Sequence, residues 1–295
     1  MKITRLFILF SIPWLAAACA TVKQEGPAVP APGPKISRAK DALKRKTPKF
    51  NAPQTLGGLI ASDSWTVYPE KQQEEFKGHV SYDNGIYTFR ADYALSDRAK
   101  STFSAAGNIY IKQAEKNGPL YEVKADDGHY NYKTGKGRLS ARKNRFVYLT
   151  YQDAQGTATH AQARKAEFDT NTKTYRLYQD VTITRPTPAG TATVTAERVL
   201  ARQNDQYAVL EGGVKLSTPQ YTMTADTLVM DGKNNKSYAF GSRTLLQGKT
   251  EQGQFAVIAD RAEAENETRL LSLKGKVQGW LVSDEINKAE INDKF

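Results

Sequence analysis

The chain has 295 residues, of which 39% are hydrophobic, a share that suits a β-rich protein with one solvated face better than a protein with a thick core. Its 42 lysine and arginine residues outnumber 31 aspartate and glutamate residues, and the net charge of +11 favours anionic partners: nucleic acid, an anionic membrane surface or a phosphorylated lipid. The amino terminus has the features of an export signal, and export argues against a role with nucleic acid.

Residues 1–18 are predicted to be a signal peptide. Lys2 and Arg5 precede an apolar run that ends at Ala18 and is too short to span a bilayer comfortably. Cys19, the only cysteine of the sequence, follows Ala16-Ala17-Ala18. Small residues before a cysteine resemble the lipobox of bacterial lipoproteins, which implies that Cys19 is lipidated and anchors the protein to the inner or the outer membrane. The alternatives are an ordinary signal peptide cut nearby and an uncleaved anchor.

Residues 19–55 are predicted to be a tether. The stretch PAVPAPGPK is rich in proline and alanine, and a basic cluster follows between Arg38 and Lys49. Neither part has an apolar pattern that could bury surface, so we expect an extended, disordered linker. The basic cluster either attracts anionic lipid headgroups or keeps the linker solvated.

From about residue 75 the sequence repeats itself. A small residue followed by an acid recurs at intervals of 29 (226 − 197) to 41 (167 − 126) residues. The recurring acids are Asp92, Asp126, Glu167, Glu197, Asp226, Asp260 and Glu290. After most of them, 14 to 16 residues on, a glycine begins a second β run, as in Gly107-Asn108-Ile109.

Within each unit the apolar residues alternate with period two, as Tyr221, Met223 and Ala225 do, which indicates half-buried strands. Asn-Gly and Asp-Gly pairs between the strands are typical of tight hairpin turns. A single hairpin cannot bury its apolar face in water, so the units are predicted to stack. Residues 56–295 are therefore expected to form one all-β domain.

An Ala-Asp or Ala-Glu pair, a turn and a Gly-x-Val run within each β unit together resemble the organic-solvent-tolerance-A (OstA)-like domain. That family includes the periplasmic A and C components of the lipopolysaccharide-transport (Lpt) bridge. The resemblance implies a β-jellyroll, or folded-over antiparallel sheet, with an apolar groove for acyl chains and open terminal strands through which members join end to end. It also implies a non-enzymatic periplasmic protein, without a cofactor, that binds lipopolysaccharide or a related acylated lipid and takes part in its transport to the outer membrane. Which component the chain matches stays open.

The repeated acids have two interpretations. A column of carboxylates could bind calcium, but there is one acid per unit and no Asp-x-Asp-x-Asp cluster. We therefore expect a structural corner ladder, in which each acid accepts backbone N–H groups where its strand bends. His79, His129 and His160 are scattered without metal-ligand spacing, so neither a metal site nor a catalytic residue is predicted.

The inward-facing apolar stripe is the candidate lipid-binding surface. Alanines such as Ala91 and Ala225 share one register and would leave room for a linear apolar ligand; the alternative is a core filled by its own side chains. The candidate groove residues are Tyr87, Phe89, Ile109, Ile111, Val123, Val194, Val214, Leu216, Tyr221, Met223, Val257 and Val277.

Two other functions remain open from sequence. The first is an envelope lipoprotein scaffold that docks other proteins through its β repeats. The second is a parallel β-helix enzyme acting on acidic polysaccharide, against which the hairpin turns argue because they favour antiparallel pairing.

Overall fold

The computed structural model describes residues 58–114, 119–153, 156–187, 190–250, 253–265 and 270–283. The predicted signal peptide, Cys19, the tether and Glu290 lie outside these residues. The described residues form strands and turns, with a single 3-10 helix, η1 (Pro69–Lys71). The prediction of an all-β fold is confirmed. Across the described ranges, no helix is long and apolar enough to cross a membrane.

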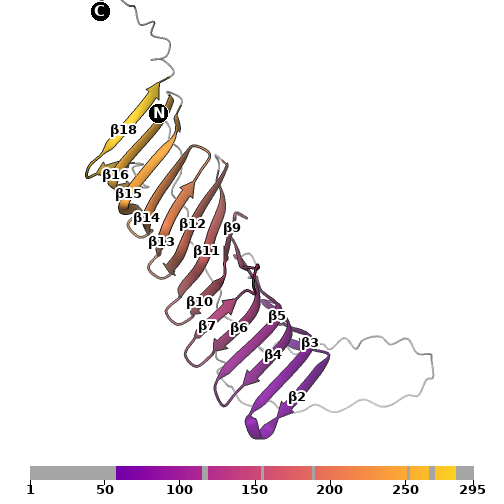
Figure 1. Ribbon diagram of the computed structural model, residues 1–295. Helices are drawn as coiled ribbons and strands as arrows, with labels where there is room; N and C mark the ends of the chain where they lie inside the picture. Colours follow the sequence, from indigo (N-terminus) through magenta and orange to yellow (C-terminus); the bar gives the residue numbers. More distant parts are fainter. Residues whose placement is uncertain are drawn as a thin grey trace, which may run out of the picture.

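The strands follow one another along the chain with short turns between them (Figure 1). In the first half they are β1 (Leu59–Ala61), β2 (Ser64–Tyr68), β3 (Gln73–Asp83), β4 (Tyr87–Asp97), β5 (Thr102–Ala114), β6 (Leu120–Asn131), β7 (Lys136–Ser140), β8 (Val147–Gln152) and β9 (Ala158–Ala163). In the second half they are β10 (Lys165–Asp169), β11 (Thr174–Thr187), β12 (Gly190–Arg202), β13 (Tyr207–Ser217), β14 (Tyr221–Asp231), β15 (Lys236–Thr250), β16 (Gly253–Glu265), β17 (Leu270–Lys274) and β18 (Gln278–Ser283).

Each of these strands belongs to one sheet of 18 strands, and each described pairing is antiparallel. This pairing excludes the parallel β-helix and removes the structural basis of the polysaccharide-active enzyme. At several places two short strands together take the place of one long strand: β1 and β2 both pair with β3, β7 and β8 with β6, β9 and β10 with β11, and β17 and β18 with β16.

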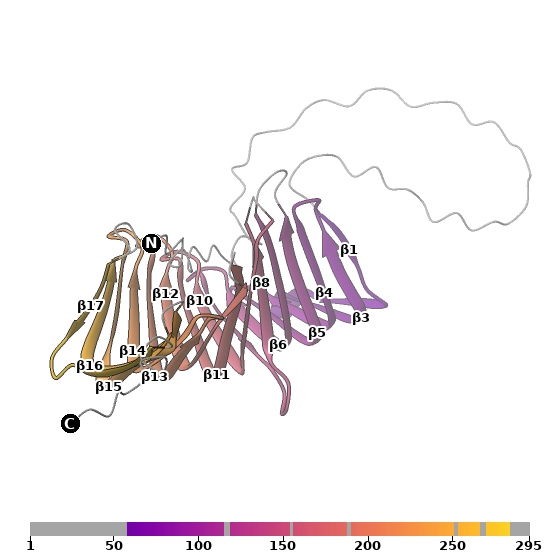
Figure 2. The ribbon, with the colours of Figure 1, turned by 90° about the horizontal axis from the view of Figure 1, so that it is seen from above.

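The sheet is folded over along its length, so that most long strands run through two layers (Figure 2). We call the half that contains β1, β8, β9 and β18 the first layer, and the half that contains β2, β7, β10 and β17 the second layer. Along the strands, the bend coincides with a shift of pairing register, for example between Arg90 and Tyr93 of β4. A β-bulge of this kind bends and twists the strand that carries it.

Two successive residues with positive φ form most bulges. Gly107 and Asn108 have φ of 74° and 47°, and Gly212 and Gly213 have 82° and 59°. Glycine suits the first position because it adopts positive φ at little cost. There is also no room for a side chain: a Cβ on Gly212 would lie 2.6 Å from the Cβ of Glu197.

One interior row of side chains runs beside the bend through successive strands, and we call it the corner row. Large and small members alternate along it, with register pairs such as Val80 with Ala91, Ile109 with Ala125 and Val214 with Ala225. Its members, all buried, are Val80, Ala91, Ile109, Ala125, Val147, Ala163, Val181, Ala196, Val214, Ala225, Thr244 and Ala259. The predicted alanines therefore do share one register, but branched side chains stand between them, so the alanines do not form a continuous column of small residues.

The hairpin turns of the second layer are joined to one another by a ladder of backbone hydrogen bonds. The first N–H of each turn donates to the last carbonyl of the preceding turn: Tyr132 to Ser101 at 3.0 Å, Thr170 to Gly135 at 2.8 Å, and Gln203 to Lys173 at 3.0 Å. Within the turns, the side-chain oxygen of an Asp or Asn accepts the backbone N–H of the residue three positions later, as Asp97 does from Lys100. This edge of the sheet is thereby tied from one repeat to the next.

Candidate functional site

A cavity of about 400 Å³ lies between the two layers in the amino-terminal half of the sheet. Its walls come from β1 and β3 to β6 and from β10, and they are mostly aromatic and aliphatic. The aromatic residues that line it are Phe76, Tyr82, Tyr87, Phe89, Phe103, Tyr121, Tyr130, Tyr132 and Phe168. Its size lies within the range of small-ligand sites, about 300–1,000 Å³.

Aromatic contacts hold the walls of the cavity in place. Phe89 of the first layer meets Phe103 of the second edge to face, with ring centroids 5.4 Å apart. Tyr130 stacks on Phe168 at 5.8 Å, and Tyr121 packs on Tyr151 at 5.2 Å. Such pairs add to area burial and fix ring orientation. The rings therefore form a preformed apolar wall.

The carboxy-terminal half of the interior is filled by its own side chains. Val194, Val214, Leu216 and Met223 are 1–8% exposed and pack in one core cluster with Leu210 of the second layer. This cluster extends from β9 to β16 and holds mostly aliphatic side chains.

The structure divides the predicted groove residues accordingly. Tyr87, Phe89, Ile111 and Val123 line the cavity. The residues outside its lining are Ile109, Val194, Val214, Leu216, Tyr221, Met223 and Val257. Val277 lies between β17 and β18 and is 49% exposed, so it does not belong to an enclosed interior.

Sequence reasoning missed the half of the cavity wall that the second layer supplies. Tyr130 and Phe168 each lie four positions beyond a bend residue, Asp126 and Arg164 respectively (130 − 126 = 4; 168 − 164 = 4). The residues at the same offset in later repeats are Ala201 and Met230. The change from aromatic to aliphatic residues at this offset was visible in the sequence.

Five of the predicted corner acids lie opposite a bulge or the loop that replaces one: Asp92, Asp126, Glu197, Asp226 and Asp260. Asp226 accepts the Ser242 backbone N–H at 2.6 Å, which holds the pKa of its carboxyl below the ordinary value. Asp126, almost fully buried, accepts the Arg142 N–H at 2.8 Å and pairs with Arg145 at 2.8 Å. Both acids thus accept a backbone N–H at the bend, which is the contact that a corner ladder would require.

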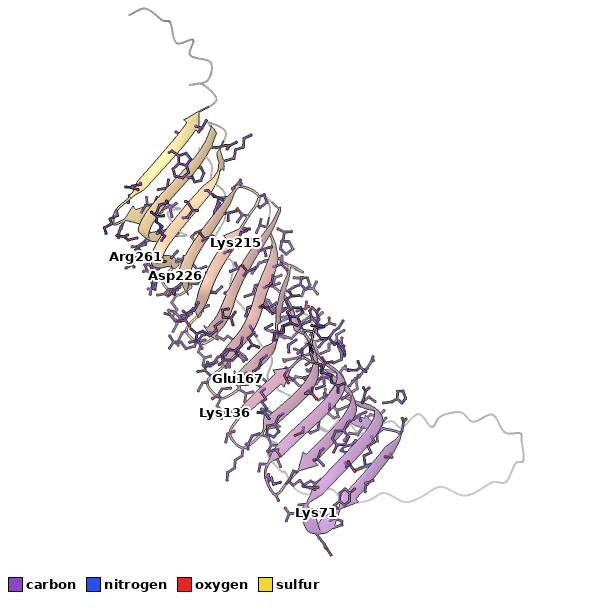
Figure 3. The ribbon with its side chains drawn as sticks, viewed as in Figure 1. Lys71, Lys136, Glu167, Lys215, Asp226 and Arg261 are labelled. Atoms are coloured by element: carbon purple, nitrogen blue, oxygen red, sulfur yellow. The ribbon has the colours of Figure 1, made fainter. Side chains whose placement is uncertain are left out.

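The prediction for Glu167 is wrong, because Arg164 occupies the bend in that repeat (Figure 3 shows Glu167 and Asp226). Arg164 pairs with Asp180 at 3.0 Å, so in this repeat the bend residue is the cation and its partner in the bulge is the acid. Gln179, rather than Asp180, stands in the place of the glycine that begins most bulges. Glu167 instead bonds Lys165 and Tyr178, and the Lys165 contact holds the pKa of Glu167 below its usual value.

A constant offset identifies the true bend residues. The bulge begins 15 residues after the bend in each described repeat, as for Asp92 and Gly107 (107 − 92 = 15) and for Arg164 and Gln179 (179 − 164 = 15). Glu167 would give 12 (179 − 167). The same offset finds a bend acid that sequence reasoning missed, Asp63, whose side chain lies against Gly78 and bonds His79.

The histidines have separate partners: His79 bonds Asp63, His129 bonds Ser104, and His160 bonds Thr150. Within the part of the chain that the structure describes, no three His, Cys, Asp or Glu side chains gather as metal ligands would.

These features define a class of protein: a long folded-over antiparallel sheet with an aromatic cavity between its layers. Residues 144–237 match the model of the family described as lipopolysaccharide-assembly, LptC-related, and the resemblance to OstA-like Lpt proteins is confirmed over that segment. No curated protein matches the sequence.

A crystal structure of LptH, described as the LptA homologous periplasmic component of the conserved lipopolysaccharide transport device from Pseudomonas aeruginosa, is similar to part of the chain. The similar region covers 55% of this chain and 94% of that one, with 9% sequence identity and a TM-score of 0.25.

Proposed function

We propose that this chain is a non-enzymatic periplasmic protein that binds lipopolysaccharide or a related acylated lipid and takes part in its transport to the outer membrane. The observation that carries the proposal is the aromatic cavity between the layers, in a chain whose residues 144–237 match an LptC-related family model. Burial of an acyl chain contributes roughly 0.8 kcal/mol per CH₂ group, so binding needs no catalytic group.

The open ends of the sheet support a bridging role. At one end, β1 and β2 pair with β3 alone among the described strands, and Trp65 is 58% exposed. At the other end, β17 and β18 pair with β16 alone in the described part, and Trp280 and Leu281 are 58% and 57% exposed. Unpaired edges with exposed apolar side chains can accept a strand from another protein. We propose that other OstA-like proteins pair there.

The anchor belongs to the same proposal. Cys19 after three alanines supports lipidation and attachment to the inner or the outer membrane. Replacing Cys19 by serine is expected to abolish lipid labelling and to release the protein into the soluble periplasmic fraction. Retention in membranes after a high-salt wash would argue against the lipid anchor.

Photo-crosslinking tests the cavity. A benzoylphenylalanine placed at Phe89 or Phe103, which meet across the cavity, is expected to capture acylated lipid in cells. The matched control is Tyr238 of β15, an aromatic residue that alternates with the buried Ser237 and Ala239 and packs on Arg261 outside the cavity. Equal capture at inner and outer positions, or none at any position in a folded protein, would overturn the lipid-binding proposal.

The second candidate is a scaffold that only docks other envelope proteins. The exposed apolar side chains at both sheet ends favour it as well as the bridge. Capture of protein at Trp65 or Trp280, combined with no lipid at Phe103, would support the scaffold.

A further inference from the structure

Arg185 places a positive charge on the interior face of the first layer. On β11 it follows Val181 and Ile183 at the alternating positions that are buried, and it pairs in register with Ala192, which is 1% exposed. Thr184 pairs with His160, which sets Arg185 beside Thr159, 5% exposed. The Arg185 side chain itself is only 13% exposed.

Arg185 lies on the same row of side chains as the cavity wall. Tyr121, which lines the cavity, pairs with Tyr151, and Tyr151 pairs with Thr159. Three strand steps at about 4.8 Å each put Arg185 roughly 14 Å from Tyr121. The row thus leads from the aromatic cavity to the guanidinium.

The guanidinium has few partners for a group so buried. Its one hydrogen bond to a described residue goes to Asp153 Oδ2 at 3.3 Å, longer than a usual charge-assisted bond. A guanidinium carries five N–H donors, and a desolvated cation is costly unless paired and hydrogen-bonded. Asp153 is also engaged elsewhere, because its Oδ1 accepts the Thr157 backbone N–H at 2.8 Å.

We propose that Arg185 binds the anionic headgroup, a phosphate or carboxylate, of an amphiphile whose hydrocarbon chain lies in the aromatic cavity. This inference rests on the proposed lipid-binding function and assigns the headgroup contact to one residue. Phosphate and carboxylate oxygens match the planar fork of arginine, and such a ligand would replace the long bond to Asp153.

The test compares amphiphiles that share a chain and differ in headgroup. Binding of dodecyl phosphate, neutral dodecyl maltoside and inorganic phosphate to the full chain is measured by calorimetry, below the micelle concentrations. The wild-type protein is expected to bind dodecyl phosphate more tightly than the maltoside. Arg185→Gln should lose about tenfold or more in affinity for dodecyl phosphate and keep its affinity for the maltoside.

Two further variants separate charge from position. Arg176→Gln removes the same charge from the same strand on the exposed opposite face and should change neither affinity. Asp153→Asn keeps the acceptor for Thr157 but removes the competing carboxylate, so it should strengthen dodecyl phosphate binding. Because this variant retains the arginine, it tests the proposal even if Arg185→Gln fails to fold.

The outcomes are distinct. If wild type binds neither amphiphile, the lipid-binding function fails, and this inference fails with it. If both amphiphiles bind and Arg185→Gln behaves like Arg176→Gln, the cavity stands and the headgroup role of Arg185 is overturned. Inorganic phosphate bound as tightly as dodecyl phosphate would assign the site to free phosphate and overturn the lipid headgroup.

Discussion

Thr244 is the polar exception in the corner row. It pairs in register with Ala259, is 1% exposed, and its hydroxyl has no hydrogen-bond partner among the described residues. The equivalent positions hold the similarly shaped Val or Ile, as at Val214. A buried hydroxyl without a partner costs free energy that a methyl group would not.

Thr244→Val is therefore expected to stabilise the protein by about 1 kcal/mol, because the shape is kept and the unpaired hydroxyl is removed. Urea unfolding followed by circular dichroism measures the change. Thr222→Val, at a less buried position on the opposite face, is the control and should change stability little. A Thr244→Val protein less stable than wild type would show that the hydroxyl has a partner.

The bend of the first repeat contains a titratable pair. His79 bonds Asp63 Oδ2 at 2.8 Å, and this contact raises the pKa of His79 above its usual value near 6.5. Since the folded-state pKa exceeds the unfolded one, the pair's contribution is fully present below about pH 6.5 and is lost as pH rises through the raised pKa.

Asp63→Asn should return the pKa of His79 toward its ordinary value and flatten stability over this pH range. An NMR titration of the His79 ring and urea unfolding on both sides of neutral pH measure the two effects. A wild-type His79 that titrates at or below the ordinary value would contradict the pairing in solution.

Among the strands, glycine is required at the bulges, because the bulge residues have positive φ. Gln179 and Asp180 hold φ of 64° and 53° in the bulge of β11, a conformation that costs non-glycine residues about 1 kcal/mol or more each. Gln179→Gly should stabilise the protein by about 1 kcal/mol despite the greater freedom of glycine in the unfolded chain.

The reverse change provides the control. Gly212→Ala is expected to destabilise by about 2 kcal/mol, because φ is 82° and the added Cβ would approach Glu197. Thermal melting of both variants measures the two changes in stability. Equal effects of the same sign would show that the bulge conformation does not set stability.

The strands and turns could be predicted from the sequence where the apolar alternation and the turn residues were regular. Period-two alternation and turn residues gave the antiparallel hairpins, since both depend on neighbouring residues. Glu167 was misassigned because the repeat was defined by a small residue followed by an acid, whereas the bend accepts Arg164 once Asp180 supplies the opposite charge. The cavity wall was only half predicted, since Phe103 and Phe89 come together only when the sheet folds over.

For the whole molecule, the exposed edge strands at the ends of the sheet can pair with a partner protein, but they can also pair with another copy of the chain. Leu281 lies on β18, whose described pairing is with β16 alone, and lysine on an edge strand discourages further pairing. Leu281→Lys should lower self-association at high concentration without loss of fold. Sedimentation velocity measures association, and Tyr148→Lys, an exposed aromatic change within the sheet, is the control. Equal association of both variants and wild type would exclude this edge as the contact.

The alternation along the corner row limits which strands can be lost or added when such a sheet becomes shorter or longer. Strands running toward the bend from the first layer contribute alanine, as at Ala196 and Ala225, while those returning contribute a branched residue, as at Val181 and Val214. Loss of one strand would set two alanines or two branched side chains together and reverse the direction of every later strand. Loss of a consecutive pair such as β13 and β14 would preserve both. The span bridged by such a protein should thus grow or shrink by whole hairpins, about 10 Å at a time for two strands spaced at about 4.8 Å.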